Sequence, residues 1–312
     1  MSYLEGKRIA VNNIIKYSKT GKMNKLLIVL LILSIHSSAQ NKINFPTPPA
    51  SPVASFMQEL GNTEITISYG RPFARGRKIF GGLVPYDSVW RTGAGESTQL
   101  VCNDEIILGD KLIPPGRYSF YTIPSPANWI IIFNTDTTIH GAFGYSQAKD
   151  LVRITVPSQQ LTAFQEVFTI DISDIDNRGG GTLQLRWENT SVKIPVRSTA
   201  DEKVCRQIEE IVLRQQNQTP DVLFQAAAYY YATSRDLSLA AEWVEKAEQT
   251  DGNNFSYPNL LQKIAGDLKQ YQKAIAAAKR ALVIAEKTKM SNQVSQLRKR
   301  IEELENKYSG RN

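Results

Sequence analysis

The sequence predicts two folded parts in one chain: an antiparallel β-sandwich or barrel, followed by an α-helical domain built from hairpin repeats. Short apolar runs with strict alternation, separated by turn residues, fill the middle of the chain. After Pro195 the apolar spacing changes to that of helices. A period of 34 residues then recurs in the helical part, which is the length of a helix-turn-helix repeat. This order of strands followed by helices indicates a β-domain and a separate helical tail.

The first 39 residues have the composition of a secretory leader. A basic segment with two lysines precedes the apolar run 26–35, and residues 37–39 (Ser-Ser-Ala) offer a small-residue cleavage site. The apolar run is shorter than the roughly 20 residues that span a bilayer. We therefore expect a cleaved leader, with an uncleaved anchor as the alternative, and Met23 is a candidate for the true start. The expected location is the periplasm, the outer envelope or the medium.

The charge of the chain is concentrated in this leader. The sequence has 37 Lys and Arg against 30 Asp and Glu, a formal net charge of +7. Six basic residues and one acidic residue lie within the first 40, so the remainder has a net charge of +2. Because nucleic-acid binding needs a concentrated basic surface, we expect no nucleic-acid partner. No second long apolar run follows the leader, so we also expect no integral membrane span after its removal.

Cysteine and histidine are scarce. Cys102 falls in the predicted β-part and Cys205 in the helical part. In an oxidising compartment they could form a disulfide between the two parts, but we favour two buried free thiols. Together with His36 and His140 they are too few for a zinc site without carboxylate ligands, so we predict no metal site and no cofactor.

The predicted β-domain covers residues 54–197. It follows a leader ending at residue 39 and a tether at residues 40–53, which contains four prolines and is therefore expected to be extended. Residues 63–70 alternate cleanly and predict a strand with one buried face. A turn is expected at 188–190 and another at 177–181. Further strand-like runs lie at 98–102, 105–108, 117–123, 129–133, 151–156, 166–173, 182–187 and 191–196.

The predicted helical tail covers residues 201–312 and begins with a helix at 201–215. Its period rests on three pairs of residues that are 34 positions apart, namely Leu237 and Tyr271, Ala240 and Ala274, and Ala247 and Ala281. The segment 219–289 resembles two tetratricopeptide repeats, which implies a surface for a protein partner. Residues 291–308 predict a charged terminal helix.

The connection between the first two predicted strands carries a second resemblance. It contains Y-G-R-P at 69–72, G-R-x-I-x-G-x-L-V-P-Y at 76–86 and V-W-R-T-G-A at 89–94, followed by Glu96. This block, together with residues 112–124 (LIPPGRYSFYTIP), resembles the family catalogued as domain of unknown function 2911, over roughly residues 46–196. Gly95 stands where that family usually has Asn. The resemblance implies an exported β-domain and no particular activity.

Six residues of this block are candidates for a ligand site: Tyr69, Arg71, Arg77, Trp90, Arg91 and Glu96. The arginines could grip a carboxylate or phosphate, and the aromatic rings could stack on a sugar or ring ligand. The structural alternative, which we favour, is that Arg71 and Arg91 bond the carbonyls of the long loop and pair with Glu96 or Asp87. Trp90 would then close the end of the sandwich.

No catalytic residue is predicted. His140 is the only histidine after the leader, and no nucleophile elbow accompanies it. We therefore expect a non-enzymatic binding or scaffold protein of the envelope with a protein partner for its helical tail. The alternative is a β-domain that binds or hydrolyses an anionic or carbohydrate envelope component.

Overall fold

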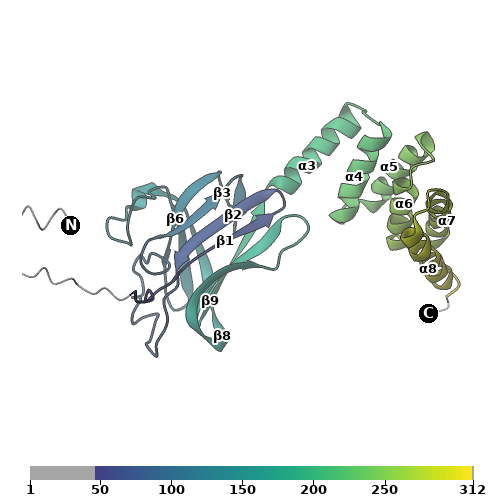
Figure 1. Cartoon of the computed structure of the whole chain (residues 1–312). Helices are drawn as coiled ribbons and strands as arrows, with labels where there is room; N and C mark the ends of the chain where they lie inside the picture. Colours follow the sequence, from purple (N-terminus) through teal and green to yellow (C-terminus); the bar gives the residue numbers. More distant parts are fainter. Residues whose placement is uncertain (1–45, 311–312) are drawn as a thin grey trace, which may run out of the picture. The chain divides into compact units, whose positions relative to one another are not determined.

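The computed structural model describes residues 46–310, and within that range the chain forms nine β-strands and six α-helices (Figure 1). The predicted leader, with its cleavage site and the candidate start at Met23, lies outside the described residues, as does the tether up to residue 45. Residues from Pro49 onward belong to one compact unit, which is described here by itself. Among residues 46–310 no helix combines the length and the apolar character that crossing a bilayer requires.

All nine strands belong to one antiparallel sheet, as the alternating runs predicted. They are β1 (Val53–Leu60), β2 (Thr63–Gly70), β3 (Thr98–Cys102), β4 (Ile106–Leu108), β5 (Lys111–Ile113), β6 (Gly116–Ile123), β7 (Asn128–Asn134), β8 (Asp150–Ser173) and β9 (Gly180–Ser198). Their order across the sheet is β1-β2-β3-β6-β7-β8-β9-β4-β5.

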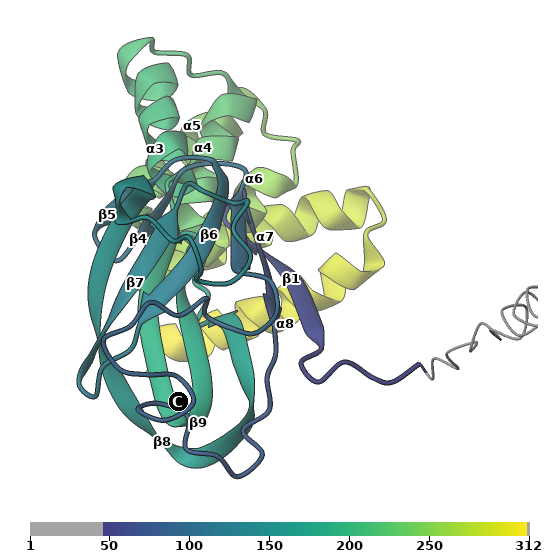
Figure 2. The same ribbon diagram turned by 90° about the vertical axis from the view of Figure 1, so that its left-hand side faces the viewer.

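The long strand β8 folds this sheet onto itself. Its first part pairs with β7 as far as Pro157, and its second part pairs with β9 from Ser158 onward (Figure 2). The two layers enclose one apolar core, in which Tyr69 of β2 meets Phe168 of β8 at a ring-centroid distance of 5.8 Å. The structure is therefore a sandwich whose layers share a strand, and each inward-facing row buries its apolar side chains on the same core.

Three details of the strands differ from the sequence prediction. The runs 151–156 and 166–173, expected as separate strands, are parts of the single strand β8. The turn expected at 188–190 is wrong, because these residues lie within β9. Glu188 takes a left-handed conformation (φ 54°) where the pairing with β8 shifts register, so the strand bends there without reversing. In addition, β1 forms an edge strand that the alternation did not reveal, since Met57 and its outward neighbours are exposed.

The helical tail contains α3 (Ala200–Ile208), α4 (Pro220–Ala232), α5 (Leu237–Thr250), α6 (Ser256–Asp267), α7 (Tyr271–Lys287) and α8 (Ser291–Tyr308). A π-helical segment, Glu209–Arg214, continues α3. The alanines that define the 34-residue period, Ala240 with Ala274 and Ala247 with Ala281, are all fully buried in α5 and α7. Their small side chains allow neighbouring helices to approach closely, which explains why alanine recurs there.

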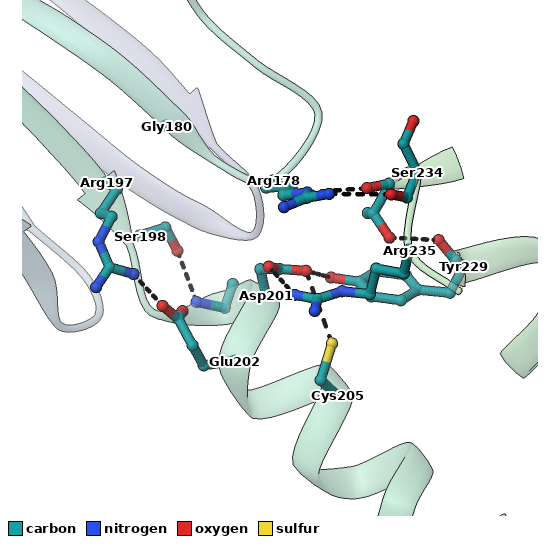
Figure 3. A network of polar contacts seen from close by, with 12 residues as sticks. Arg178, Gly180, Arg197, Ser198, Asp201, Glu202, Cys205, Tyr229, Ser234 and Arg235 are labelled. Carbon is teal, nitrogen blue, oxygen red and sulfur yellow. Dashed lines mark hydrogen bonds and ion pairs between the residues drawn. The ribbon is translucent and has the colours of Figure 1, made fainter. Parts of the chain in front are cut away.

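A polar network surrounds the first turn of α3 (Figure 3). The buried Asp201 carboxylate accepts hydrogen bonds from the Tyr229 hydroxyl at 2.7 Å and from the Arg235 guanidinium. From the β8–β9 turn, Arg178 Nε donates to the carbonyl of Thr233 at 2.8 Å, just beyond the end of α4. A cation at a helix C-terminus compensates the unpaired carbonyls there, so this arginine stabilises the end of α4.

Cys102 and Cys205 are both buried and free, which agrees with the free-thiol alternative. Burial raises the pKa of each thiol, and the nearby Asp201 raises that of Cys205 further. The thiols therefore stay protonated and act as small apolar groups in the two parts of the chain.

Candidate functional site

The connection from β2 to β3 is fixed to both layers of the sandwich. On one side, the amide of Ala74 donates to Glu166 at 2.7 Å, and Phe73 forms an isolated bridge with Val167 of β8. On the other side, Trp90 and Thr122 of β6 exchange backbone hydrogen bonds of 2.7 and 3.0 Å. A connection of this length is usually functional or a structured cover, and these bonds hold it rigidly across one end of the core.

The loop carries Trp90 into an aromatic cluster at that end. The Trp90 ring stacks on Trp187 of β9 (centroids 5.9 Å, interplanar angle 18°) and meets Phe168 at 5.0 Å. Phe80 and Trp129 complete the cluster through edge contacts. Trp90 Nε1 donates to the carbonyl of Gly93 at 3.1 Å, so the indole is fixed in position and its polar atom is satisfied.

An open pocket of about 260 Å³ lies over this cluster. Most of its lining residues are apolar, and the polar side chains among them are those of Ser88 and Arg91. The lining residues are Pro72, Leu83, Val84, Pro85, Ser88, Val89, Trp90, Arg91, Gly93, Ala94, Gly95 and Trp187. A mostly apolar wall with a few grouped polar atoms is typical of small-molecule sites.

Of the six predicted site residues, the structure places Trp90 and Arg91 in this pocket. The Tyr69 hydroxyl instead donates to the carbonyl of Ile170 at 3.1 Å and accepts from its amide at 2.9 Å. Burial raises the pKa of this tyrosine, so the phenol remains neutral and holds β2 against β8.

Arg71 and Arg77 bond the protein itself. Arg71 Nε donates to the carbonyl of Phe168 at 3.1 Å, and one of its Nη2–H groups donates to Thr169 Oγ1 at 3.0 Å. Arg77 donates to the carbonyls of Phe73 and Ala74 at 2.7 and 3.0 Å. Arg77 thus fixes the path of the loop, and Arg71 ties the start of the loop to β8.

Arg91 and Glu96 lie at the far end of the loop. Arg91 donates through Nη1 to the carbonyl of Gly95 at 2.6 Å, and its guanidinium also lies against Gly141. The Glu96 carboxylate pairs with the His140 imidazole, and both side chains are exposed. Such an exposed pair contributes little to stability, but it turns the acidic group of this loop toward the 138–141 segment.

The turn between Arg91 and Gly95 is strained. Thr92 is fully buried and adopts a left-handed conformation with φ of 55°. For a β-branched residue this backbone conformation is a genuine outlier. It is fixed by neighbours, since Thr92 Oγ1 donates to Thr122 Oγ1 at 3.1 Å and its carbonyl accepts from Thr98 Oγ1 at 2.7 Å. Strain of this kind costs of order 1–3 kcal/mol and concentrates at ligand and active sites.

The sequence did not reveal Trp187 or Thr92 as parts of the site. Trp187 follows Leu183 and Leu185 on the inward face of β9, so its burial was predictable from alternation. Its stacking on Trp90 was not, because the two residues are nearly a hundred positions apart and meet only through the fold. Thr92 carries no local signal of its left-handed backbone, which is usually marked by Gly or Asn.

Within residues 46–310, no group of three or more His, Cys, Asp or Glu side chains is arranged to hold a metal ion. Asp176, in the β8–β9 turn, accepts from the amides of Arg178 and Gly180 at 2.8 and 2.9 Å. These bonds lower the pKa of its carboxyl group and shape the turn.

Residues 51–196 match the sequence model of one family, whose description is "Protein of unknown function (DUF2911)". Comparison with curated proteins and comparison with solved structures each gave no match.

Proposed function

Because residues 51–196 form a domain of the DUF2911 family, we propose that this domain is a ligand-binding module in a non-enzymatic protein of the cell envelope. The ligand would occupy the open pocket over Trp90 and Trp187. Export is supported by the leader-like composition of residues 1–39.

The observation that carries this proposal is the strained Thr92 directly beside the pocket. Thr92 lies between two lining residues, Arg91 and Gly93, and is held in its left-handed conformation by buried hydrogen bonds. If the turn served only to close the sandwich, Gly at this position would adopt the same conformation with less strain than Thr. The strain is accounted for if the conformation serves to aim neighbouring groups into the pocket.

The chemistry of the lining favours binding. Trp90 offers a ring fixed by its own hydrogen bond, and Val84 and the prolines extend the apolar surface. Rigid aromatic surfaces bind rings and sugar faces with little loss of side-chain freedom. Arg91 and Ser88 would then orient the polar end of the ligand.

The four tryptophans of the chain allow a direct test. Trp90, Trp129 and Trp187 belong to the aromatic cluster, whereas Trp243 lies in α5 of the tail. Their indole N–H signals would be followed by NMR while a library of small aromatic and sugar fragments is added. We expect some fragments to shift the signals of Trp90 and Trp187 and to leave Trp243 unchanged. If no fragment moves the Trp90 signal, or if binders move Trp243 instead, the pocket is not the site.

A second candidate function is partner binding through a tetratricopeptide-like tail. Besides the buried alanine pairs, a groove of about 310 Å³ lies between α3 with its π-helical continuation and α4. Ile208, Ile211 and Val222 line this groove. Helical-hairpin solenoids present extended surfaces of this kind to partners.

This second function predicts a selective loss of partners. The variant Ile211→Glu would place a charge in the groove, and Val283→Glu would place the same charge on an exposed position of α7 outside it. In pull-downs from envelope extract, Ile211→Glu should lose partners that Val283→Glu and the unmodified chain retain. Equal recovery with both variants would reject binding at this groove.

A further inference from the structure

Building on the proposed function, we infer that the ligand of the Trp90 pocket is an organic anion. Its carboxylate or phosphate group binds Arg91 and the amides of the 93–95 turn, and its flat apolar body lies against Trp90. This assignment rests on Arg91 and the 93–95 turn. The aromatic rings of Trp90 and Trp187 alone would not indicate a charged ligand.

The amides of the turn are free to bind an anion. The N–H groups of Gly93, Ala94 and Gly95 donate to no acceptor among residues 46–310, and the segment forms no hydrogen-bonded turn. Gly93 is nevertheless buried. Most buried amides have a partner, and one without a partner in the protein is explained by water or a ligand.

The backbone conformation of the turn suits this role. Ala94 has a negative φ and is followed by Gly95 with φ of 73°, while Thr92 before them has φ of 55°. Successive residues of opposite φ direct neighbouring N–H groups toward one side, which creates an anion-binding concavity in a loop. In this turn the successive residues of opposite φ are Ala94 and Gly95. Gly93, with an extended φ of 158°, separates them from the strained Thr92.

Arg91 adds the positive charge. Its Nη1 donates to Gly95, and its remaining N–H groups have no acceptor among the described residues, although the side chain lines the pocket. None of these nitrogens is both buried and unpaired, so they reach solvent. A guanidinium with free N–H groups forms strong charge-assisted hydrogen bonds with carboxylate or phosphate.

The acidic groups of the neighbourhood do not occupy the pocket. No lining side chain is a carboxylate, and Glu96, the acidic residue of this turn, pairs with His140. Within the described part of the chain Arg91 makes no ion pair, and its guanidinium bonds the carbonyl of Gly95 and lies against Gly141. Lower polarity strengthens the attraction between Arg91 and an anionic group.

A matched pair of ligands tests this inference. Naphthalene-1-acetate and naphthalene-1-acetamide have the same shape and differ in charge. Binding to the full mature chain would be followed through the indole N–H signal of Trp90. We expect the acid to bind about ten-fold more tightly than the amide, since hydrogen bonds to charged groups are about twice as strong as neutral ones. Inorganic phosphate should compete with the acid, because both place an anionic group on Arg91.

Variants locate the charge recognition. Arg91→Gln should abolish the preference for the acid while amide binding persists, and Arg91→Lys should retain part of it. Arg117→Gln serves as the matched control, because this arginine is exposed on β6 and lies outside the pocket lining. Equal binding of acid and amide, or an unchanged preference in Arg91→Gln, would overturn the anion assignment and leave the pocket itself intact. Failure of both compounds to shift Trp90 would overturn the assignment together with the proposed pocket.

Discussion

Replacing Gly70 by Ala should disrupt the pocket through a single added methyl group. A Cβ at Gly70 would lie 1.9 Å from the carbonyl oxygen of Ala94 and 2.9 Å from its carbon. Ordinary contacts of this kind are 3.4 Å or longer, so the turn must retreat by about 1.5 Å. Gly70 has no positive φ, and the backbone itself would therefore accept alanine without strain.

The expected cost is about 3 kcal/mol. Overpacking against a fixed backbone costs typically 1–3 kcal/mol. Displacement of the turn also weakens the hydrogen bond from Trp90 Nε1 to Gly93, which is worth about 1 kcal/mol. This is a large share of the stability of an ordinary domain, which is about 5–15 kcal/mol.

Denaturant unfolding followed by NMR would measure this cost in each part of the chain. Three tryptophans report on the β-domain, and Trp243 reports on the tail. Gly70→Ala should lower the midpoint of the β-domain signals, shift the Trp90 indole signal in the folded state and leave the Trp243 midpoint unchanged.

Gly252→Ala is the matched control for this experiment. The nearest atom to a Cβ at Gly252 is the carbonyl oxygen of Glu248 at 3.6 Å, and its φ is not positive. This change should alter the stability of the tail by less than about 1 kcal/mol. If Gly70→Ala lowers the stability of the β-domain by no more than Gly252→Ala lowers that of the tail, the backbones of Gly70 and Ala94 do not approach closely.

Three further changes test the contacts around the site. Arg71→Met should lower the free energy of unfolding of the β-domain by about 2 kcal/mol, because the Phe168 carbonyl loses a charged donor; binding of naphthalene-1-acetate should be unchanged in a titration of the folded protein. Tyr69→Phe should cost about 1–3 kcal/mol in denaturant unfolding, since the amide and the carbonyl of Ile170 both lose their buried partner. The pKa of Tyr145 is raised to about 12 by burial and by its bond to a carboxylate, so its stabilising contribution is complete below pH 10 and is lost between pH 10 and 12. Ultraviolet titration of tyrosinate should show one fewer group ionising above pH 11 in Tyr145→Phe.

The sheet could be predicted from alternation because its strands bury one face each. Residues 63–70 were predicted as a strand and form β2 with the same limits, since every second side chain enters the core. The edge strand β1 was not predicted, because its outward side chains are exposed and its sequence shows no clear alternation of polar and apolar residues. The sequence did not predict that β9 continues through 188–190, because a polar Glu-Asn-Thr segment is typical of a turn. Pairing with β8 keeps these residues in the strand.

The site was harder to predict than the fold because its parts meet across the two layers. The sequence singled out the arginines of the 71–91 loop as a group, yet the structure separates them by the acceptors they find. Arg71 donates to the carbonyl of Phe168 in β8, nearly a hundred residues away along the chain, and this bond fixes its guanidinium on the protein. Among residues 46–310, Arg91 donates only to the carbonyl of the nearby Gly95, and its other N–H groups have no acceptor. The chemistry of a guanidinium is the same in both places, so the difference in role follows from the neighbouring carbonyls, which the sequence alone does not reveal. A loop arginine that the fold leaves partly unpaired, beside amides that are also unpaired, is where an anionic ligand gains the most.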